Sequence, residues 1–586
     1  MTTSTTNRRV LWLITIMLLA SWCVGMFSRG YWTPDEPREA DISWRMSWQA
    51  DPAVPLLAGE AFCEKPPLTY WLSGASMRLF GAAGWAARLP NLFYAIVTTL
   101  SVAWLARRLA GTLAATAAAA ASATFLLSYQ VAIWLATDAP LLAAVALALA
   151  GACAGFYAED RRQRLFGYLV MHAALALGFL AKSAAAWMVP ALALATLIVW
   201  ERRWREALRW ELWIGLPLQA LIIGAWVWSV YDGPQGADHL RVFFWNNLVG
   251  RFTHIDAPLD LQYATGHRNS PGKYLLEMPI YLFPWTLLVI AAGARAWRRR
   301  ADLGPDLRAV RFALAAALPP LLVLSLATTA RNIYLAPALP AVAILLGWWA
   351  SEANAGPRRA DTLALRATAG LLLLATFVAV AAVALGWLDA AVTGGVPAGI
   401  AAMAALGATA GIALSLLAWR AAGRRQVQGA LLALLLAYCS LLIGPASMAY
   451  RLADRWQDLA AIGAELKASV GAAPLVLVAP DETTRAWVDL YVSTAVERTG
   501  APTDEAVLRH LSALLNGAPR LRFALVQLDG RALTPQLQNL ARSVGLRRLQ
   551  AAVPAAPAWI AAAQLRIARV YSLPNGRRYA LLAGAP

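Results

Sequence analysis

The sequence predicts a polytopic α-helical membrane protein that ends in a small α/β domain. Of the 586 residues, 59% are hydrophobic and only 14% are charged, whereas soluble domains carry about 25% charged residues. Apolar runs of the length that crosses a membrane recur as far as residue 448. Beyond that point they give way to short strand-like stretches. We therefore expect a membrane domain over residues 1–448 and a domain outside the membrane over residues 449–586.

About thirteen apolar runs are candidate membrane spans. They cover residues 10–28, 86–106, 111–128, 139–157, 166–181, 184–200, 212–230, 276–295, 308–328, 333–349, 364–386, 397–420 and 428–448. The first run has a basic start and no A-x-A-like cleavage site after it, so we expect an uncleaved helix with a cytoplasmic N-terminus. Arginine pairs and clusters then fall in alternate, cytoplasmic loops. They lie at Arg8-Arg9, Arg107-Arg108, Arg161 to Arg164, Arg202 to Arg205, Arg298 to Arg300, Arg358-Arg359 and Arg424-Arg425.

The apolar stretch "KPPLTYWLSGASMRLFG" over residues 65–81 is not counted as a span. It is short and contains internal glycine and arginine, and counting it would place Arg107-Arg108 on the opposite side of the membrane. We expect an interfacial helix on the outer surface instead. Residues 29–85 then form one long periplasmic loop, and residues 232–274 form a second.

The C-terminal region shows the alternation of a small α/β domain. Short strands are expected within residues 473–480, 520–530 and 577–584. Helical stretches are expected near residues 481–497, 505–516 and 534–543.

Composition and motifs exclude several classes of function. The four cysteines lie far apart without a CxxC pair, which excludes a disulfide framework and a thiolate zinc cluster. The sequence has no Walker A, GxGxxG or GxSxG motif, so no nucleotide-binding or acyl-hydrolase signature is present. The net charge of +18 is explained by arginine-rich cytoplasmic loops beside anionic lipid, so no nucleic-acid partner is expected.

Charged residues gather at both ends of the first periplasmic loop. The stretch "YWTPDEPREADISWRM" carries Asp35, Glu36, Arg38, Glu39 and Asp41. One interpretation is a solvated helix start in which Thr33 caps the helix and the acids favour its positive end. A second charged set, Glu64-Lys65, stands at the other end of the loop. The two sets could therefore converge on a cavity where a carboxylate acts as a base and a cation holds a phosphate.

Further polar side chains fall on the same side of the membrane. They are Asp138, Lys182, Arg251, His254, Asp256, His267, Arg268, Lys273, Arg331 and Tyr334. Lys182 alone could be a lysine that snorkels from a short outer connection. Ionisable groups at a membrane edge are functional candidates by default, because burying them is unfavourable. Together these residues give an excess of cations with a few carboxylates, which suits an anionic lipid headgroup.

Several motifs resemble the GT-C glycosyltransferases that use lipid-linked sugars. The stretches "DEPREADISWRM" (35–46) and "FCEKPPLTYWL" (62–72) are similar to the branch that contains aminoarabinose transferases of lipid A and bacterial relatives of protein mannosyltransferases. The stretches "AARLPNLFYA", "TDAPLL", "GFLAKS", "GRF", "GHRNSPGKY" and "RNIYLAPALP" resemble later motifs of that branch in the same order. The likeness covers about residues 8–350.

The resemblance implies a sugar donor on an undecaprenyl-type phosphate and transfer at the periplasmic face of the bacterial inner membrane. It implies Asp35 as the base, Glu64 as a reserve base or ligand of a divalent metal, and Arg38, Lys65, Lys182, Arg251 and Tyr334 as groups at the donor phosphate. Further site candidates are Glu36, Asp138, His267 and Arg331. The sequence departs from the family pattern at Glu39, Cys63, Ser183 and Asn246-Asn247.

A phosphate leaving group develops negative charge as the glycosidic bond breaks, and fixed cations in a partly dry site stabilise that charge. We therefore expect direct displacement with inversion, in which one base near the acceptor suffices. The acceptor remains open between lipid A, another glycolipid or glycan, and a protein hydroxyl. No cofactor is firmly expected, although a divalent metal fits the resemblance, and a monomer is expected. The alternative class is a lipid or sugar transporter or flippase, but the sequence shows no inverted repeat and its charges gather at one face.

Overall fold

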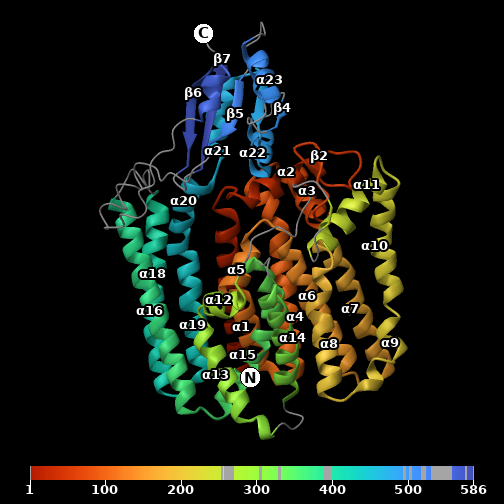
Figure 1. Ribbon diagram of the computed structural model, residues 1–586. Helices are drawn as coiled ribbons and strands as arrows, with labels where there is room; N and C mark the ends of the chain where they lie inside the picture. Colours follow the sequence, from red (N-terminus) through yellow and green to blue (C-terminus); the bar gives the residue numbers. More distant parts are fainter. Residues whose placement is uncertain are drawn as a thin grey trace.

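A bundle of long helices carries a small sheet at one end in the computed structural model (Figure 1). The structure describes residues 2–251, 255–256, 270–302, 307–327, 331–388, 397–492, 496–500, 505–516, 523–528, 557–573 and 577–584. The N-terminus lies low in the bundle and the C-terminus lies beyond the sheet (Figure 1). The loop over residues 29–85, called the first loop here, lies between the helices and the sheet (Figure 1).

The bundle contains helices from most of the expected apolar runs. They are α1 (Thr2–Phe27), α4 (Gly84–Thr124), α5 (Leu126–Ile133), α6 (Asp138–Phe156), α7 (Arg161–Lys182), α8 (Ala185–Trp200), α9 (Trp210–Trp213), α10 (Leu216–Tyr231), α12 (Lys273–Tyr281), α13 (Thr286–Arg298), α14 (Arg308–Leu326), α15 (Leu339–Ala355), α16 (Arg359–Leu388), α18 (Ala398–Gly423) and α19 (Val427–Ile443). Short connections are helical at η1 (Trp204–Glu206), α11 (Gly236–Leu240), η2 (Arg241–Leu248), η3 (Val249–Arg251), η6 (Arg300–Asp302) and η8 (Asn332–Ala338).

Ten helices of the described chain are long and apolar enough to cross a membrane, or eleven if the bent pair α12 and α13 forms one span. The expected number of about thirteen is higher for two reasons. Helix α8 is apolar but shorter than the other spans. Helix α4 contains two expected runs, which meet at Gly111, where φ is 88°. Glycine alone adopts such a backbone conformation without strain, so the chain turns there.

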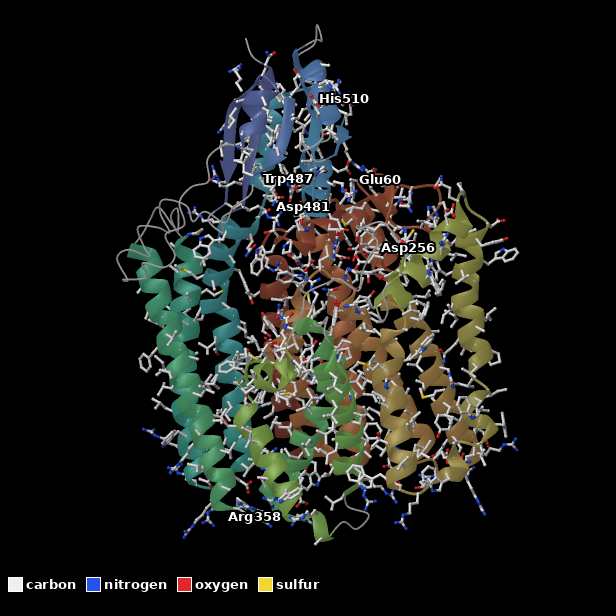
Figure 2. The ribbon with its side chains drawn as sticks, in the orientation of Figure 1. Glu60, Asp256, Arg358, Asp481, Trp487 and His510 are labelled. Atoms are coloured by element: carbon white, nitrogen blue, oxygen red, sulfur yellow. The ribbon has the colours of Figure 1, made fainter. Side chains whose placement is uncertain are left out.

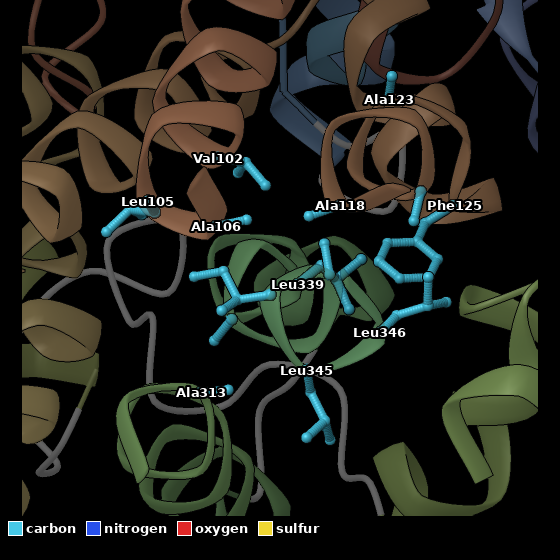
Figure 3. Packing of buried hydrophobic residues seen from close by; sticks show 14 of the residues in the cluster. Val102, Leu105, Ala106, Ala118, Ala123, Phe125, Ala313, Leu339, Leu345 and Leu346 are labelled. Carbon is cyan, nitrogen blue, oxygen red and sulfur yellow. The ribbon is translucent and has the colours of Figure 1, made fainter. Parts of the chain in front are cut away.

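Close contact between helices holds the bundle together. Helix α15 packs along α4, and Leu339 and Leu346 of α15 belong to the same buried cluster as Val102 and Ala106 of α4 (Figure 3). At Gly347, a Cβ atom would lie 2.5 Å from the carbonyl oxygen of Ala114. Small residues at such crossings let membrane helices approach closely, and dispersion contacts then replace the hydrophobic effect as the source of stability.

The first loop forms two short helices and a hairpin at the sheet-bearing end of the bundle (Figure 1). Helix α2 (Asp35–Met46) begins shortly after α1, and strands β1 (Leu56–Leu57) and β2 (Glu60–Ala61) pair antiparallel. Helix α3 (Leu68–Phe80) forms within the stretch expected to be interfacial. At 13 residues it is about 20 Å long, too short to cross a bilayer.

The C-terminal region forms a five-stranded mixed sheet in the order β4-β3-β5-β7-β6. Its strands are β3 (Leu475–Val478), β4 (Val496–Thr499), β5 (Phe523–Gln527), β6 (Leu565–Ser572) and β7 (Arg578–Gly584). Its helices are α21 (Ala460–Val470), α22 (Glu482–Tyr491), α23 (Glu505–Asn516) and α25 (Ala558–Ala562). Helix α20 (Pro445–Gln457), which precedes them, packs on the bundle helices α16, α18 and α19. Strand β3 pairs parallel with β4 and β5, and β7 pairs antiparallel with β5 and β6.

The three expected strands are confirmed as β3, β5 and β7. Strands β4 and β6 were not expected, because both are edge strands that carry charged or exposed residues in place of an apolar run. The expected helix over residues 481–497 ends at Tyr491, and β4 follows. The expected helix near residues 534–543 lies outside the described residues.

Candidate active site

Glu36 fixes the start of α2 against the bundle. Its carboxylate accepts hydrogen bonds from Arg29 (2.5 Å) and Arg88 (2.8 Å), both fully buried, and from the backbone N–H groups of Trp32 and Leu135 (2.8 Å each). Burial alone would raise the pKa of Glu36, but the two guanidinium groups outweigh it and hold this pKa at about 2. Its oxygens are thus committed to holding α1, α2 and α4 together.

The solvated interpretation of this helix start is wrong. Glu36, Glu39 and Asp41 are all buried. Thr33 does not cap the helix, because its hydroxyl donates to the side-chain oxygen of Gln457 at 2.8 Å. Charged groups so far from water require partners, and the loop supplies them from distant parts of the chain.

Glu39 joins the two charged sets of the loop. Its carboxylate lies 2.7 Å from Nζ of Lys65 and 3.2 Å from Nη2 of Arg38, and it accepts a hydrogen bond from the hydroxyl of Tyr70 at 2.9 Å. Burial opposes its ionisation, but Lys65 and Arg38 prevail and lower the pKa of Glu39. The two ends of the loop therefore converge, and a buried carboxylate holds the Lys65 ammonium in place.

Asp35 connects α2 with a segment almost three hundred residues later. Its Oδ2 accepts a hydrogen bond from Nη2 of Arg331 at 2.6 Å, and its Oδ1 lies 3.4 Å from Nη2 of Arg38. Partial burial would raise the pKa of Asp35, but Arg38, Arg331 and Lys65 lower it. Asp35 is therefore an ionised acceptor at neutral pH, and it remains partly open to solvent.

Lys182 forms a second group with Asp138 and Tyr334. Its Nζ lies 2.6 Å from Oδ1 of Asp138 and 4.8 Å from the centre of the Tyr334 ring. Lys182 therefore does not simply snorkel into solvent. Tyr334 and Arg331 belong to one helical turn, since the Tyr334 N–H donates to the Arg331 carbonyl at 3.0 Å. The Lys182 group and the Asp35 group are thus neighbours through η8.

The structure gives fewer side-chain contacts for the other expected site residues, Glu64, Arg251 and His267. Glu64 is partly buried, and its negative charge acts on both Arg38 and Lys65. Its backbone carbonyl accepts a hydrogen bond from the side chain of Asn247, which joins η2 to the first loop. The side chain of Arg251 and all of His267 lie outside the described residues. The roles of all these residues stay predictions.

Sequence reasoning did not single out two residues that contact this group. Tyr70 lies within the quoted motif, and its position one helical turn beyond the prolines was an available signal. Glu482, in the first turn of α22, lies 2.6 Å from Nη1 of Arg38. No local pattern marks it, because its partner is 444 positions away. Figure 2 shows Asp481 and Glu60 where the C-terminal sheet domain meets the first loop.

A metal site does not emerge from the described residues. Within them, no group of three or more His, Cys, Asp or Glu side chains is arranged to hold a metal ion. His254 and His267 lie outside the part of the chain that the structure describes. Metal binding by Glu64 stays a prediction.

Comparison with known proteins identifies similar sequences. Residues 64–228 match the family described as dolichyl-phosphate-mannose-protein mannosyltransferase. The undecaprenyl phosphate-alpha-4-amino-4-deoxy-L-arabinose arabinosyl transferase of Pseudomonas paraeruginosa is 29% identical over 380 residues, which cover 64% of this chain and 66% of that protein. The enzyme of the same name from Erwinia tasmaniensis is 31% identical over 54% of this chain and 55% of its own. The matches thus span less than two thirds of the relatives' length.

Solved structures extend the likeness to almost the whole chain. ArnT from Cupriavidus metallidurans in the apo state aligns with a TM-score of 0.69 and 18% identity over 99% of this chain and 100% of its own. This chain has the GT-C fold. The same protein bound to undecaprenyl phosphate aligns with a TM-score of 0.67 and 19% identity, over 98% of this chain and 99% of that one.

The comparisons confirm the resemblance drawn from the motifs and the expected fold class. This GT-C chain is an integral membrane protein whose helices carry a small sheet domain. The helices that carry the candidate site, α2 and α3, lie at the end of the bundle that faces the sheet (Figure 1). Arg358 lies at the opposite end of the GT-C bundle, far from Glu60 and Asp256 (Figure 2).

Proposed function

We propose that this protein transfers a sugar from an undecaprenyl-phosphate-type donor to an acceptor at the periplasmic face of the inner membrane. One observation carries the proposal: Arg38, Lys65 and Arg331 converge on Asp35 and Glu39 at the end of a membrane bundle. Cations at this depth suit a lipid phosphate, and the carboxylate suits an acceptor hydroxyl or amine. The names of the similar enzymes support the same donor class.

The donor phosphate binds the cationic side in this proposal. Arg38 offers a planar set of N–H donors, and Lys65 and Lys182 add point charges. As the bond from the sugar carbon to the phosphate oxygen breaks, the electron pair leaves with that oxygen. Fixed cations in a partly dry site stabilise the new charge more effectively than water does, because they need no reorganisation.

Asp35 serves the acceptor in this proposal. It is ionised, partly exposed and held by two arginines, so it can accept a hydrogen bond from an incoming hydroxyl and take its proton. Glu64 is the reserve base. Attack from the face opposite the phosphate inverts the sugar carbon. No step in this sequence passes through a metal ion.

The acceptor is proposed as lipid A, with other glycolipids, glycans and protein hydroxyls as outcomes of the test. Mass spectrometry of lipid A and envelope glycans from a deletion strain should show a lost sugar on lipid A. Unchanged lipid A together with an altered glycan or protein would reassign the acceptor while keeping the donor.

A transporter or flippase, the alternative class, is less well supported, because the similar proteins are transferases.

Two substitutions test the proposed chemistry with purified protein and an undecaprenyl-phosphate-linked sugar. Asp35→Asn should lower sugar transfer by at least about 100-fold, the lower range for loss of a general base. Lys65→Ala should lower it by about 100-fold through loss of a charge-stabilising donor. Glu159→Gln and Lys467→Ala remove charges at exposed positions away from the candidate site and should leave transfer unchanged. Near-normal transfer by both site variants would remove this site from the reaction.

A further inference from the structure

Arg38 is shared between two parts of the protein. Its Nη2 lies 3.4 Å from Asp35 and 3.2 Å from Glu39, both in its own helix. Its Nη1 lies 2.6 Å from Oε2 of Glu482 in the sheet domain. One donor position of a proposed phosphate-binding guanidinium is thus occupied by a carboxylate from outside the membrane domain.

Glu482 differs from the other carboxylates that pair with cations of the candidate site. The side chains of Glu39, Asp138 and Asp35 are 1%, 8% and 20% exposed, whereas that of Glu482 is 42% exposed. Within the described residues, Arg38 is the one cation in salt-bridge distance of Glu482. A partly exposed pair with one contact is weak and readily exchanged.

We propose that Glu482 is a displaceable counter-ion, which the donor phosphate replaces on Arg38. This inference rests on the proposed function. A guanidinium binds phosphate oxygens with the same planar geometry that it uses for carboxylates. When the phosphate binds, the Glu482 side chain turns to solvent, and it returns when the phosphate leaves.

The exchange favours release of the product. The donor phosphate links two groups and carries one negative charge, whereas the released polyprenyl phosphate has a second ionisable oxygen and carries about −1.5 to −2. Arg38 therefore holds the product more strongly than the donor. Glu482 competes for the same guanidinium and limits how tightly the product binds.

The sheet domain stays in place during this exchange, because other contacts hold it. Arg45 Nε lies 2.9 Å from Asp489, and Arg485 lies 2.9 Å from Glu60. The Thr483 hydroxyl donates to the Pro34 carbonyl at 3.0 Å. Loss of the Glu482 carboxylate alone should therefore leave the fold and the docking of α22 intact.

Binding of undecaprenyl phosphate to the purified full-length protein in detergent tests the inference. Glu482→Gln should bind this lipid about two- to fivefold more tightly, the range expected for a partly exposed ion pair. Undecaprenyl phosphate should also inhibit sugar transfer by this variant more strongly, by the same factor. The kcat of the variant and its KM for the donor should both fall. Glu482→Asp keeps the charge and should restore values close to those of the unaltered protein.

Two controls isolate the contact with Arg38. Glu60→Gln removes a carboxylate from the same junction but faces Arg485 and Arg498, so it should leave the affinity unchanged. In an Arg38→Ala background, Glu482→Gln should have no further effect. Equal affinity of Glu482→Gln and the unaltered protein, or an equal gain in Glu60→Gln, would overturn the counter-ion role alone. An unaltered protein that neither binds this lipid nor transfers sugar would overturn the proposed function as well.

Discussion

Glu39 shows how a single residue changes the character of the candidate site. It stands at a position where the sequence departs from the pattern of the family that its motifs resemble, and it introduces a buried negative charge. The charge pairs with Lys65 and Arg38, and Tyr70 completes its hydrogen bonds. The site cations are therefore held in fixed positions before any substrate binds, which is the condition for effective stabilisation of a developing charge.

Glu36 is the residue whose ionisation contributes most clearly to stability. Its pKa is lowered from 4.5 to about 2, so its ion pairs stabilise the folded protein fully above about pH 4.5, and this contribution is lost as the pH falls toward 2. The shift corresponds to a contribution on the order of 3 kcal/mol at neutral pH.

Glu36→Gln should therefore lower the melting temperature by several degrees at pH 7, because two buried guanidinium groups lose their counter-charge. The difference from the unaltered protein should shrink as the pH falls below about 4. Thermal unfolding followed by tryptophan fluorescence between pH 3 and pH 8 measures this. A constant difference across that range would mean that the lost packing, and not the charge, matters.

At the scale of elements, the crossing of α15 and α4 is a place where the bundle tolerates little change. Gly347 faces the backbone of Ala114, which cannot move aside as the end of a side chain could. Gly347→Val should separate the two helices and lower the melting temperature by several degrees. Gly224→Val, on α10 with open space around its Cβ position, is the matched control and should change it little. Similar losses in both variants would assign the effect to valine in a helix and not to the crossing.

The elements divide into those that the sequence predicts and those that it does not. Long apolar runs predicted the membrane helices because burial in lipid requires both apolar side chains and paired backbone groups. The order of the motifs predicted that the loop around Asp35 and Lys65 carries residues of the candidate site. The break at Gly111 lies where the expected runs 86–106 and 111–128 meet. The edge strands β4 and β6 were missed, since neither leaves a periodic apolar signal. The Glu482 contact was out of reach because it depends on how two folded domains meet.

At the scale of the whole molecule, the sheet domain and the first loop behave as one docked unit. Asp41 of α2 lies at their junction, where burial and the neighbouring Asp489 raise its pKa well above the usual value. A raised pKa means that the neutral form of Asp41 stabilises the junction, and that this stabilisation is lost as the pH rises through the pKa. Arg45 pairs with Asp489 and so limits the repulsion between the Asp41 and Asp489 carboxylates.

Asp41→Asn should therefore raise the melting temperature at pH 8 by a few degrees, because the amide remains neutral and can still accept the hydrogen bond from Ala58 N–H. At pH 5 the gain should be smaller. Asp256→Asn, at an exposed position, controls for a general loss of charge. A lower melting temperature at pH 8 would show that the Asp41 carboxylate is needed in its ionised form.

Charge balance in the candidate site also determines how the donor reaches it. Arg38, Lys65, Lys182 and Arg331 each face a carboxylate. Among the side chains that the structure describes, this cluster is balanced and projects little field beyond its own diameter, so we expect it not to draw anionic lipids from a distance. Diffusion within the leaflet then governs encounter, and adding sodium chloride should alter the donor on-rate far less than it does for enzymes with an unbalanced basic cleft.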